Sequence, residues 1–436
     1  MDVQVRQPIR YRYWRALPLI IYSLMCYFMT GVVSGIINVA AVLYEQDRGW
    51  DATLLTSAVS VAALLNVVAG YIAGRMMARR SAKPMCVIWG VFFIIGVLVM
   101  GVSAHVGTFL VAMCVTNAAS SAWGYNTVPV FITRWFPTKK GTVQGFASMG
   151  ILLGSVTSMV YTWAYRTFGP AFATVPFALF GLVALVILMV CISDWPEQKG
   201  LMPDTMERCE PIESPSDSMG ASVDGNADLG RKAPAASEVK RFLSHPVFVL
   251  LTVVLGIQLV YAGGIMVQLV PRLIEAGFTL DESALIMMLA SLLACVGSFA
   301  AGVIGDRFGA KVGVCVTFAV GAAGVVLNLV PNNIMVILGV VCIGCVVGSA
   351  DNWPVTICAE LFDRSTFPQV FGVMFPTIQL VGALGPALIA QVARLSGGYH
   401  VAYVLLAVLM VVGAVSFPPL MRIVQERNCA ENPKKR

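Results

Sequence analysis

The chain has 436 residues, of which 58% are hydrophobic and only 12% are charged. A soluble globular domain carries roughly twice that charged fraction, so the composition excludes an ordinary water-soluble protein. The formal net charge is +6, and its distribution along the chain indicates membrane topology rather than a nucleic-acid surface. Only helices and closed barrels satisfy the backbone inside lipid, and the apolar runs here do not alternate, so helical spans are predicted.

Twelve apolar runs follow one another, each long enough for a bilayer-spanning helix. They cover residues 17–44, 52–74, 84–104, 107–131, 141–165, 171–193, 246–271, 282–304, 311–330, 334–358, 368–393 and 399–421. Residues 194–244, rich in Pro, Ser, Gly, Asp and Glu, separate the sixth run from the seventh. The sequence therefore predicts an all-α integral membrane protein. A six-helix bundle (1–193) precedes a largely disordered cytoplasmic linker (194–244) and a second six-helix bundle (245–436) with a short cytoplasmic tail.

The basic residues predict the orientation of the spans. Of the 29 Lys and Arg residues, only Arg48, Arg166, Arg272 and Arg394 fall in the loops on one side. The others lie in the termini, the linker and the alternate loops, all on the opposite side. Because basic residues accumulate in cytoplasmic loops, we expect a multi-pass protein of the cell membrane with both termini in the cytoplasm.

Two short patterns recur in the second half of the chain. Residues 70–75 (GYIAGR), at the end of the second run, return as residues 302–307 (GVIGDR) at the end of the eighth, 232 positions later. Residues 126–130 (NTVPV) in the fourth run return as residues 351–355 (DNWPV) in the tenth, 225 positions later. The similar offsets predict duplication of a six-span unit, with both copies in the same orientation because six is even.

The second copy of the first pattern carries a resemblance. Gly302-x-x-x-Asp306-Arg307-x-Gly309-x-Lys311 resembles the cytoplasmic loop signature of the major facilitator superfamily. The twelve-span layout, the cytoplasmic termini and the central linker fit the same superfamily, so the resemblance covers essentially the whole chain. It implies a monomeric secondary transporter, built from twelve helices in two six-helix pseudo-repeats, that works by alternating access.

Three further stretches resemble one branch of that superfamily. Residues 134–141 (RWFPTKKG), 195–204 (WPEQKGLMPD) and 384–386 (LGP) are similar to segments of the oxalate:formate antiporters and monocarboxylate transporters. This resemblance implies a small organic substrate without identifying it.

The loop signature implies a gate at the cytoplasmic side. Asp306, where the eighth span meets the cytoplasm, is placed to accept hydrogen bonds from the start of a neighbouring helix or to pair with Arg307. Alternatively, the charged residues of this loop only keep it on the cytoplasmic side and have no gating role. In the first copy Gly74 stands where an Asp is usual and cannot make the carboxylate contact. The expected gating motif comprises Gly302, Asp306, Arg307, Gly309 and Lys311, with Gly70 and Arg75 from the first copy.

Asp351 is the one acidic residue placed inside an apolar run. Ionisable residues at membrane depth are costly and usually functional, so Asp351 is a candidate proton site, counter-charge or substrate ligand. A structural bond to groups freed near Pro354 is an equal alternative. Spans 1, 4, 7 and 10 usually line the cavity in the resembled superfamily, which adds Asn126, Asn38, Gln258, Gln268, Tyr261 and Trp353 as pathway candidates. Interhelical hydrogen bonds are the favoured explanation for each of the amides taken singly, and also for Asn66, Asn117 and Gln379, whereas packing or interfacial belts would explain the aromatic residues.

The absence of Lys and Arg from the middle of every run limits the substrate. A dicarboxylate such as oxalate would lack a buried counter-charge, whereas a monocarboxylate entering as the neutral acid, or another small organic solute, stays compatible. We expect coupling to protons or to a counter-substrate. No cofactor or metal is expected, and no phosphate-binding loop for ATP is present.

Two other classes compete with a transporter. An intramembrane enzyme would need paired Asp, Ser with His, or a metal cluster at membrane depth. The three His residues, at positions 105, 245 and 400, lie near run ends, so that chemistry is not expected. A membrane sensor on a transporter scaffold, which binds without flux, stays open.

Overall fold

The computed structural model describes residues 13–77, 81–199, 201, 203–204 and 245–431, and every regular element in that part of the chain is helical. The first half contains α1 (Tyr13–Arg48), α2 (Ala52–Met77), α3 (Ala82–Val102), α4 (Val106–Ser121), the π-helix η1 (Ala122–Thr127), α5 (Val128–Trp135), α6 (Lys140–Ser155), α7 (Ser158–Phe168), α8 (Pro170–Cys191) and η2 (Pro196–Lys199). The second half contains α10 (Pro246–Glu275), α11 (Leu280–Phe308), α12 (Ala310–Leu329), α13 (Asn333–Ser349), α14 (Asn352–Leu361), α15 (Phe367–Gly382), α16 (Gly385–Ser396) and α17 (Tyr399–Glu431).

The helices account for all the predicted runs. Within the described residues, ten helices are long and apolar enough to cross a membrane, and the bent pair α13–α14 makes an eleventh. The shorter apolar helix Val61–Met77, within α2, occupies the second predicted run. Large apolar side chains such as Val111 and Val190 are 65% and 70% exposed on the bundle surfaces, which lipid can cover. The prediction of an all-α membrane fold is therefore confirmed.

The fourth and tenth spans are each interrupted near a proline. In the fourth span the chain passes through η1, where the Asn126 amide donates to the Ser121 carbonyl 3.1 Å away, five residues earlier. In the tenth span α13 and α14 meet at an angle of 47°. Pro354 has no N–H with which to bond the carbonyl of Ala350, so the helix bends there. Both interruptions fall on the recurring pattern at residues 126–130 and 351–355.

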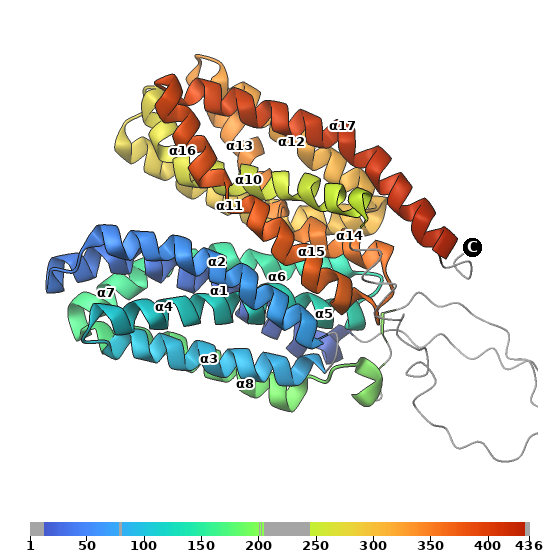
Figure 1. Ribbon diagram of the computed structural model, residues 1–436. Helices are drawn as coiled ribbons and strands as arrows, with labels where there is room; N and C mark the ends of the chain where they lie inside the picture. Colours follow the sequence, from blue (N-terminus) through green and yellow to red (C-terminus); the bar gives the residue numbers. More distant parts are fainter. Residues whose placement is uncertain (1–12, 78–80, 200, 202, 205–244, 432–436) are drawn as a thin grey trace, which may run out of the picture.

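The two halves form separate bundles that approach each other at one end (Figure 1). We call this end the linker side: α1 begins there, α8 ends there and α10 begins there. In Figure 1 it lies on the right, and the bundles separate toward the left, where α7 and α16 lie. Across the halves, α6 packs against α11 and α14, and α15 packs against α2 and η1.

The start of the predicted linker is part of the folded structure, which corrects the expected boundary at Asp194. The Asp194 carboxylate is buried and accepts hydrogen bonds from the backbone N–H groups of Ala82 and Lys83, at 2.7 and 3.1 Å. Further along, Asp204 accepts from the backbone N–H groups of Thr138 and Lys139, at 3.0 and 3.1 Å. These carboxylates cap the starts of α3 and α6, so residues 194–199, 201 and 203–204 belong to the first bundle. The remainder of the predicted linker, residues 205–244, lies outside the described residues.

Candidate functional site

Asp351 lies in the two-residue break between α13 and α14, partly exposed. It is ten residues from the linker-side end of α14 at Leu361, which at 1.5 Å per residue puts it roughly 15 Å deep, near the middle of a bilayer. Asp351 lies within electrostatic range of Tyr27 of α1 and Tyr125 of η1, both in the other half. The acid predicted from sequence is therefore at the interface between the halves.

Aromatic and amide side chains surround this position from both halves. The Tyr27 hydroxyl accepts a 2.6 Å hydrogen bond from the Gln144 amide of α6. The Tyr27 ring meets the Tyr125 ring edge-on, with centroids 5.6 Å apart, and the Tyr125 ring lies 5.6 Å from Phe375 of α15. A continuous row of side chains thus crosses from the first half to the second beside Asp351.

A buried polar network joins the halves next to Asp351. The Asn352 amide oxygen accepts a 2.6 Å hydrogen bond from the Ser148 hydroxyl of α6, and its nitrogen donates to the Ser298 carbonyl of α11 at 2.8 Å. The two serine hydroxyls are 2.7 Å apart, and that of Ser298 also donates to the Gly145 carbonyl at 2.8 Å. All three side chains are at most 3% exposed. Separating the halves would break several buried hydrogen bonds at once.

Asn126 lies where three elements meet. Its amide nitrogen would be 3.2 Å from a Cβ on Gly70 of α2, and that Cβ would lie 2.8 Å from Pro376 of α15. Its amide oxygen is buried without a hydrogen-bond partner among the described residues. Asn126 is therefore at the interface between the halves, and Gly70 serves there as a point of close approach rather than as part of a polar gate.

The predicted gating carboxylate makes the contact expected of it. Asp306 accepts hydrogen bonds from the backbone N–H groups of Gly141 and Thr142, at 2.8 and 2.6 Å, at the start of α6 in the other half. A negative charge at a helix start is favourable because the N–H groups there lack partners within the helix. Gly302, one turn before Asp306, packs against the same helix start. A Cβ on Gly302 would lie 2.1 Å from the Gly141 carbonyl oxygen.

The other motif residues have different positions. Gly309 joins α11 to α12 with φ of 84°, a conformation that side chains other than glycine adopt only with strain. Arg75 and Arg307 are exposed, and Lys311 is half-buried in the first turn of α12.

Cationic and aromatic side chains form a second cross-half contact at the linker side. The Trp195 ring lies between two guanidinium groups, with the Arg134 Cζ 4.5 Å and the Arg364 Cζ 5.2 Å from the ring centre. Arg364, in the loop between α14 and α15, also pairs with Glu197 at 3.4 Å and donates to the Arg134 carbonyl. Arg134 pairs with Asp194 at 3.3 Å. Trp195 and Glu197, at the start of the predicted linker, thus bind Arg364 of the opposite half.

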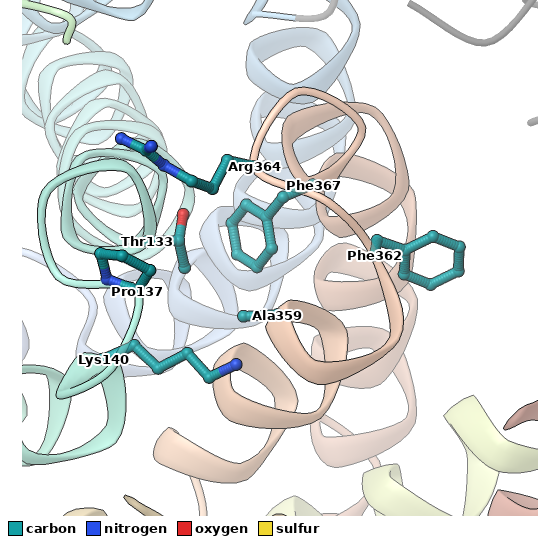
Figure 2. Close-up of a pocket in the computed structure, with 7 residues that line it drawn as sticks. All are labelled: Thr133, Pro137, Lys140, Ala359, Phe362, Arg364 and Phe367. Atoms are coloured by element: carbon teal, nitrogen blue, oxygen red, sulfur yellow. The ribbon is translucent and has the colours of Figure 1, made fainter. Parts of the chain in front are cut away.

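A small cavity of about 40 Å³ lies beside this contact (Figure 2). Its lining comes from both halves, and in Figure 2 the Lys140 side chain extends toward Ala359. The volume suits one or two water molecules rather than an organic solute. The lining residues are Thr133, Pro137, Lys140, Ala359, Phe362, Arg364 and Phe367.

Several predicted pathway residues are instead bonded inside the second half. The Tyr261 hydroxyl donates to the Gly321 carbonyl at 3.1 Å, and the Trp353 indole donates to Thr317 at 3.0 Å. The Gln268 amide oxygen accepts from the Tyr399 hydroxyl at 2.8 Å. These bonds connect α10 and α14 to neighbouring helices of the same bundle, so they account for the three residues without a ligand.

The remaining candidates are less constrained. Gln258 is buried, and both ends of its amide lack a partner among the described residues. The side chain of Asn38, in α1, lies outside the part that the structure describes. Arg272 is held by Asn328 and Glu275 and is only 8% exposed, so its guanidinium group is not free to bind an anion. The described residues contain no group of three metal-ligating side chains.

Sequence reasoning missed the serine pair and the linker-side contact. Ser148 and Ser298 are unremarkable residues in apolar runs, and no local pattern indicates that they meet. Arg364 was recognised only as a basic loop residue. The Gly-rich fifth run, with Gly145 one turn before Ser148, was the available signal for close helix packing at this place.

Comparison with known proteins agrees with this architecture. The chain matches the sequence profile of the Major Facilitator Superfamily over residues 23–386 and again over 275–435. Its fold is similar to that of the proton:xylose symporter XylE (12% identity, TM-score 0.70, 94% of this chain and 97% of that one). It is also similar to the transporter FucP in its outward conformation (12% identity, TM-score 0.68, 93% and 98%). The human organic anion transporter MFSD10 (TETRAN) is a third similar structure (13% identity, TM-score 0.65, 95% and 100%).

No curated protein sequence matches the chain. The profile match covers most of the chain, and the bundles, the repeated motif and the cross-half contacts agree with it. The chain belongs to the Major Facilitator Superfamily, a family of multi-pass membrane transporters.

Proposed function

We propose that this protein moves a small organic solute across the cell membrane by alternating access, as a secondary transporter whose linker side faces the cytoplasm. The observation that carries the proposal is the position of the cross-half contacts. Those between described residues, from Gly74–Gly372 and Asp306–Gly141 to Tyr125–Phe375, lie between the linker-side ends and the middle of the helices. With the linker in the cytoplasm, this arrangement is an outward-facing state.

The basic residues support this orientation. Arg75, Lys83, Arg134, Lys140 and Arg307 all lie at linker-side helix ends, as expected for the cytoplasmic face. Protease added to inside-out vesicles should therefore cut within residues 205–244. Cleavage there only in right-side-out vesicles would reverse the assignment. Because the interface lies within one chain, a monomer embedded in the lipid bilayer is sufficient for transport, and no nucleic-acid partner is expected.

The solute is proposed to be neutral when it crosses. Within the described spans, Lys and Arg side chains occur at helix ends, and Arg272, the most buried in the second half, is already held by Asn328 and Glu275. A carboxylate anion would thus meet no cation at the depth of Asp351. A monocarboxylate in its protonated form, as the resemblance of residues 134–141 to the monocarboxylate branch suggests, or another neutral solute would suit the site.

Proton coupling is proposed at Asp351. This carboxyl group is partly exposed at the interface, near mid-membrane, and is next to the Asn352 network that joins the halves. It could load a proton from one side and release it to the other as the halves alternate. Two of the similar structures are proton symporters, of xylose and of fucose, which supports this form of coupling.

Proteoliposome uptake with and without a pH gradient tests the proposal. Asp351→Asn should abolish gradient-driven accumulation while exchange at equal pH survives, because the amide keeps the shape but cannot titrate. Asp281→Asn, on an exposed acid at the far end of α11, is the control and should behave as wild type. Undiminished accumulation by Asp351→Asn would place the coupling elsewhere. Binding of solutes without any flux would instead favour the membrane sensor.

A further inference from the structure

Amide side chains lie on both helices of the α2–α15 crossing and on α4, which packs against α2. Asn66 of α2 donates a 3.2 Å hydrogen bond to the amide oxygen of Asn117 in α4. Gln379 lies in α15, on the other half. The oxygens of Asn66 and Gln379 are buried without a partner among the described residues. All three residues are partly exposed.

The packing of the two helices indicates that Asn66 and Gln379 are neighbours. Gly74 of α2 meets Gly372 of α15. Gly70, one turn before Gly74, meets Pro376, which is one turn after Gly372. The helices therefore run in opposite directions here, and one further turn places Asn66 opposite Leu380, beside Gln379. Asn66 is eleven residues from the end of α2 at Met77, and Gln379 is twelve from the start of α15 at Phe367. Both are thus roughly 17 Å from the linker side, at a depth similar to that of Asp351.

An amide group restricts what can bind it, because it both accepts through its oxygen and donates through its nitrogen. A carboxylate can only accept, so it cannot serve the two unmatched oxygens. An ammonium can donate to them, but it would bring an unpaired charge to membrane depth beside three neutral amides. A hydroxyl group or a protonated carboxyl group donates and accepts without carrying a charge. Unmatched buried oxygens are costly, which gives a ligand of this kind an energetic advantage at the cluster.

We propose that Asn66, Asn117 and Gln379 form a solute-binding subsite that recognises a neutral group able both to donate and to accept a hydrogen bond, namely a hydroxyl or a protonated carboxyl. The proposal rests on the transport function proposed above and specifies the solute chemistry of that site. The subsite contains residues of both halves and borders the Gly70–Pro376 contact. A bound solute there bridges α2 and α15.

Thermal stabilisation of the purified protein by solutes tests the subsite independently of flux. The probes are two matched sets whose members each carry a single polar group: 1-propanol, propionate and propylammonium, and cyclohexanol, cyclohexanecarboxylate and cyclohexylammonium. We expect stabilisation by the neutral members at any pH. Stabilisation by a carboxylic acid should appear near about pH 5 and fade toward about pH 7.5, as its carboxyl ionises. A pH-independent effect thus identifies a hydroxyl, and a pH-dependent effect identifies a protonated carboxyl.

Substitutions then locate the binding. Gln379→Met and, separately, Asn66→Leu should weaken the apparent affinity for the stabilising solute about five- to tenfold, the effect of one or two hydrogen bonds. Thr377→Val is the matched control, because it removes the 2.5 Å contact between Thr377 and the Tyr71 hydroxyl on the same two helices but leaves the amides intact.

Four results would overturn the subsite: stabilisation by the ammonium members, stabilisation by carboxylates that persists at about pH 7.5, unchanged affinity in Gln379→Met, or no stabilisation by any probe. Since Gln379 is partly exposed, its substitution is expected to leave folding intact even if Asn66→Leu does not fold. Loss of proton coupling in Asp351→Asn with normal solute binding would leave the subsite standing. The two proposals can therefore fail separately.

Discussion

Gly74 of α2 and Gly372 of α15 pack backbone against backbone, so that a Cβ on Gly74 would lie 2.3 Å from the Cα of Gly372. Gly74 and Asp306 occupy the same place in the two copies of the repeated motif, 232 residues apart. Their partners, Gly372 and Gly141, are related by nearly the same offset. One copy of the interface therefore closes by direct backbone contact, and the other closes through a carboxylate at a helix start.

The first prediction concerns this glycine pair. Gly74→Val should force α2 away from α15, because no side chain fits in 2.3 Å, and should shift the population from the state closed at the linker side toward one open there. Labelling of a cysteine introduced near the linker-side end of α15, by a membrane-impermeant maleimide in inside-out vesicles, should increase. Gly107→Val is the control, since nothing lies within 4 Å of its added Cβ. Equal labelling of the two variants would refute the role of the glycine contact.

The second prediction concerns the gate. Asp306→Asn should express and fold normally but transport several-fold more slowly. The lost charge at the start of α6 is worth about 1 kcal/mol, enough to change conformer populations about fivefold. Initial uptake rates normalised to the amount of protein measure this effect. Glu282→Gln, which alters a helix cap inside one half, is the control. Normal kinetics in Asp306→Asn would remove this residue from the mechanism.

The third prediction concerns the start of the linker. Trp195→Ala and Arg364→Ala should each loosen the linker side, because Arg364 contacts the first half through Trp195, Glu197 and the Arg134 carbonyl. Maleimide accessibility from the linker side should rise for both variants. Lys199→Ala should not change it, since among the described residues the Lys199 amine donates to the Val190 carbonyl of its own half. In the double variant, accessibility should rise no further than in either single variant. If the effects of the two substitutions add instead, the two side chains do not act as one contact.

The fourth prediction concerns stability rather than transport. Asp194→Ala removes two hydrogen bonds to the start of α3 and leaves the buried Arg134 without its 3.3 Å partner. An unpaired buried charge is expensive, so we expect a loss of about 3 kcal/mol and a clearly lower melting temperature in detergent. Glu197→Ala, at a more exposed residue of the same segment, should lower the melting temperature little. A melting temperature unchanged by Asp194→Ala would mean that this segment does not support the bundle.

Asp204 adds a pH dependence to the same segment. Burial raises the pKa of the Asp204 carboxyl, although the N–H groups of Thr138 and Lys139 act in the opposite direction. Protonation on acidification would therefore begin at a higher pH than for an exposed Asp and would weaken the cap on α6.

The sequence alone was sufficient to predict the all-α membrane fold and the repeated motif. It also identified Asp306 and Asp351 as candidate functional residues. The physical reason is that lipid imposes one-dimensional rules: a span must be long, apolar and helical, and an acid within it is costly enough to be noticed. The substrate, the coupling and the orientation stay proposals. Asp194 and Asp204, inside the expected linker, cap helices of the first bundle, and composition does not reveal that a single carboxylate caps a distant helix.

The tertiary structure decided which polar residues meet. Asn126 and Asp351 lie between the halves, whereas Tyr261, Gln268 and Trp353, equally plausible in sequence, are bonded within one bundle. Ser148 and Ser298 come together only because α6 packs on α11, and Gly74 meets Gly372 only because α2 packs on α15. Their separations in sequence exceed one hundred residues, and a periodic apolar pattern specifies which face of a helix is buried but not which helix will cover it.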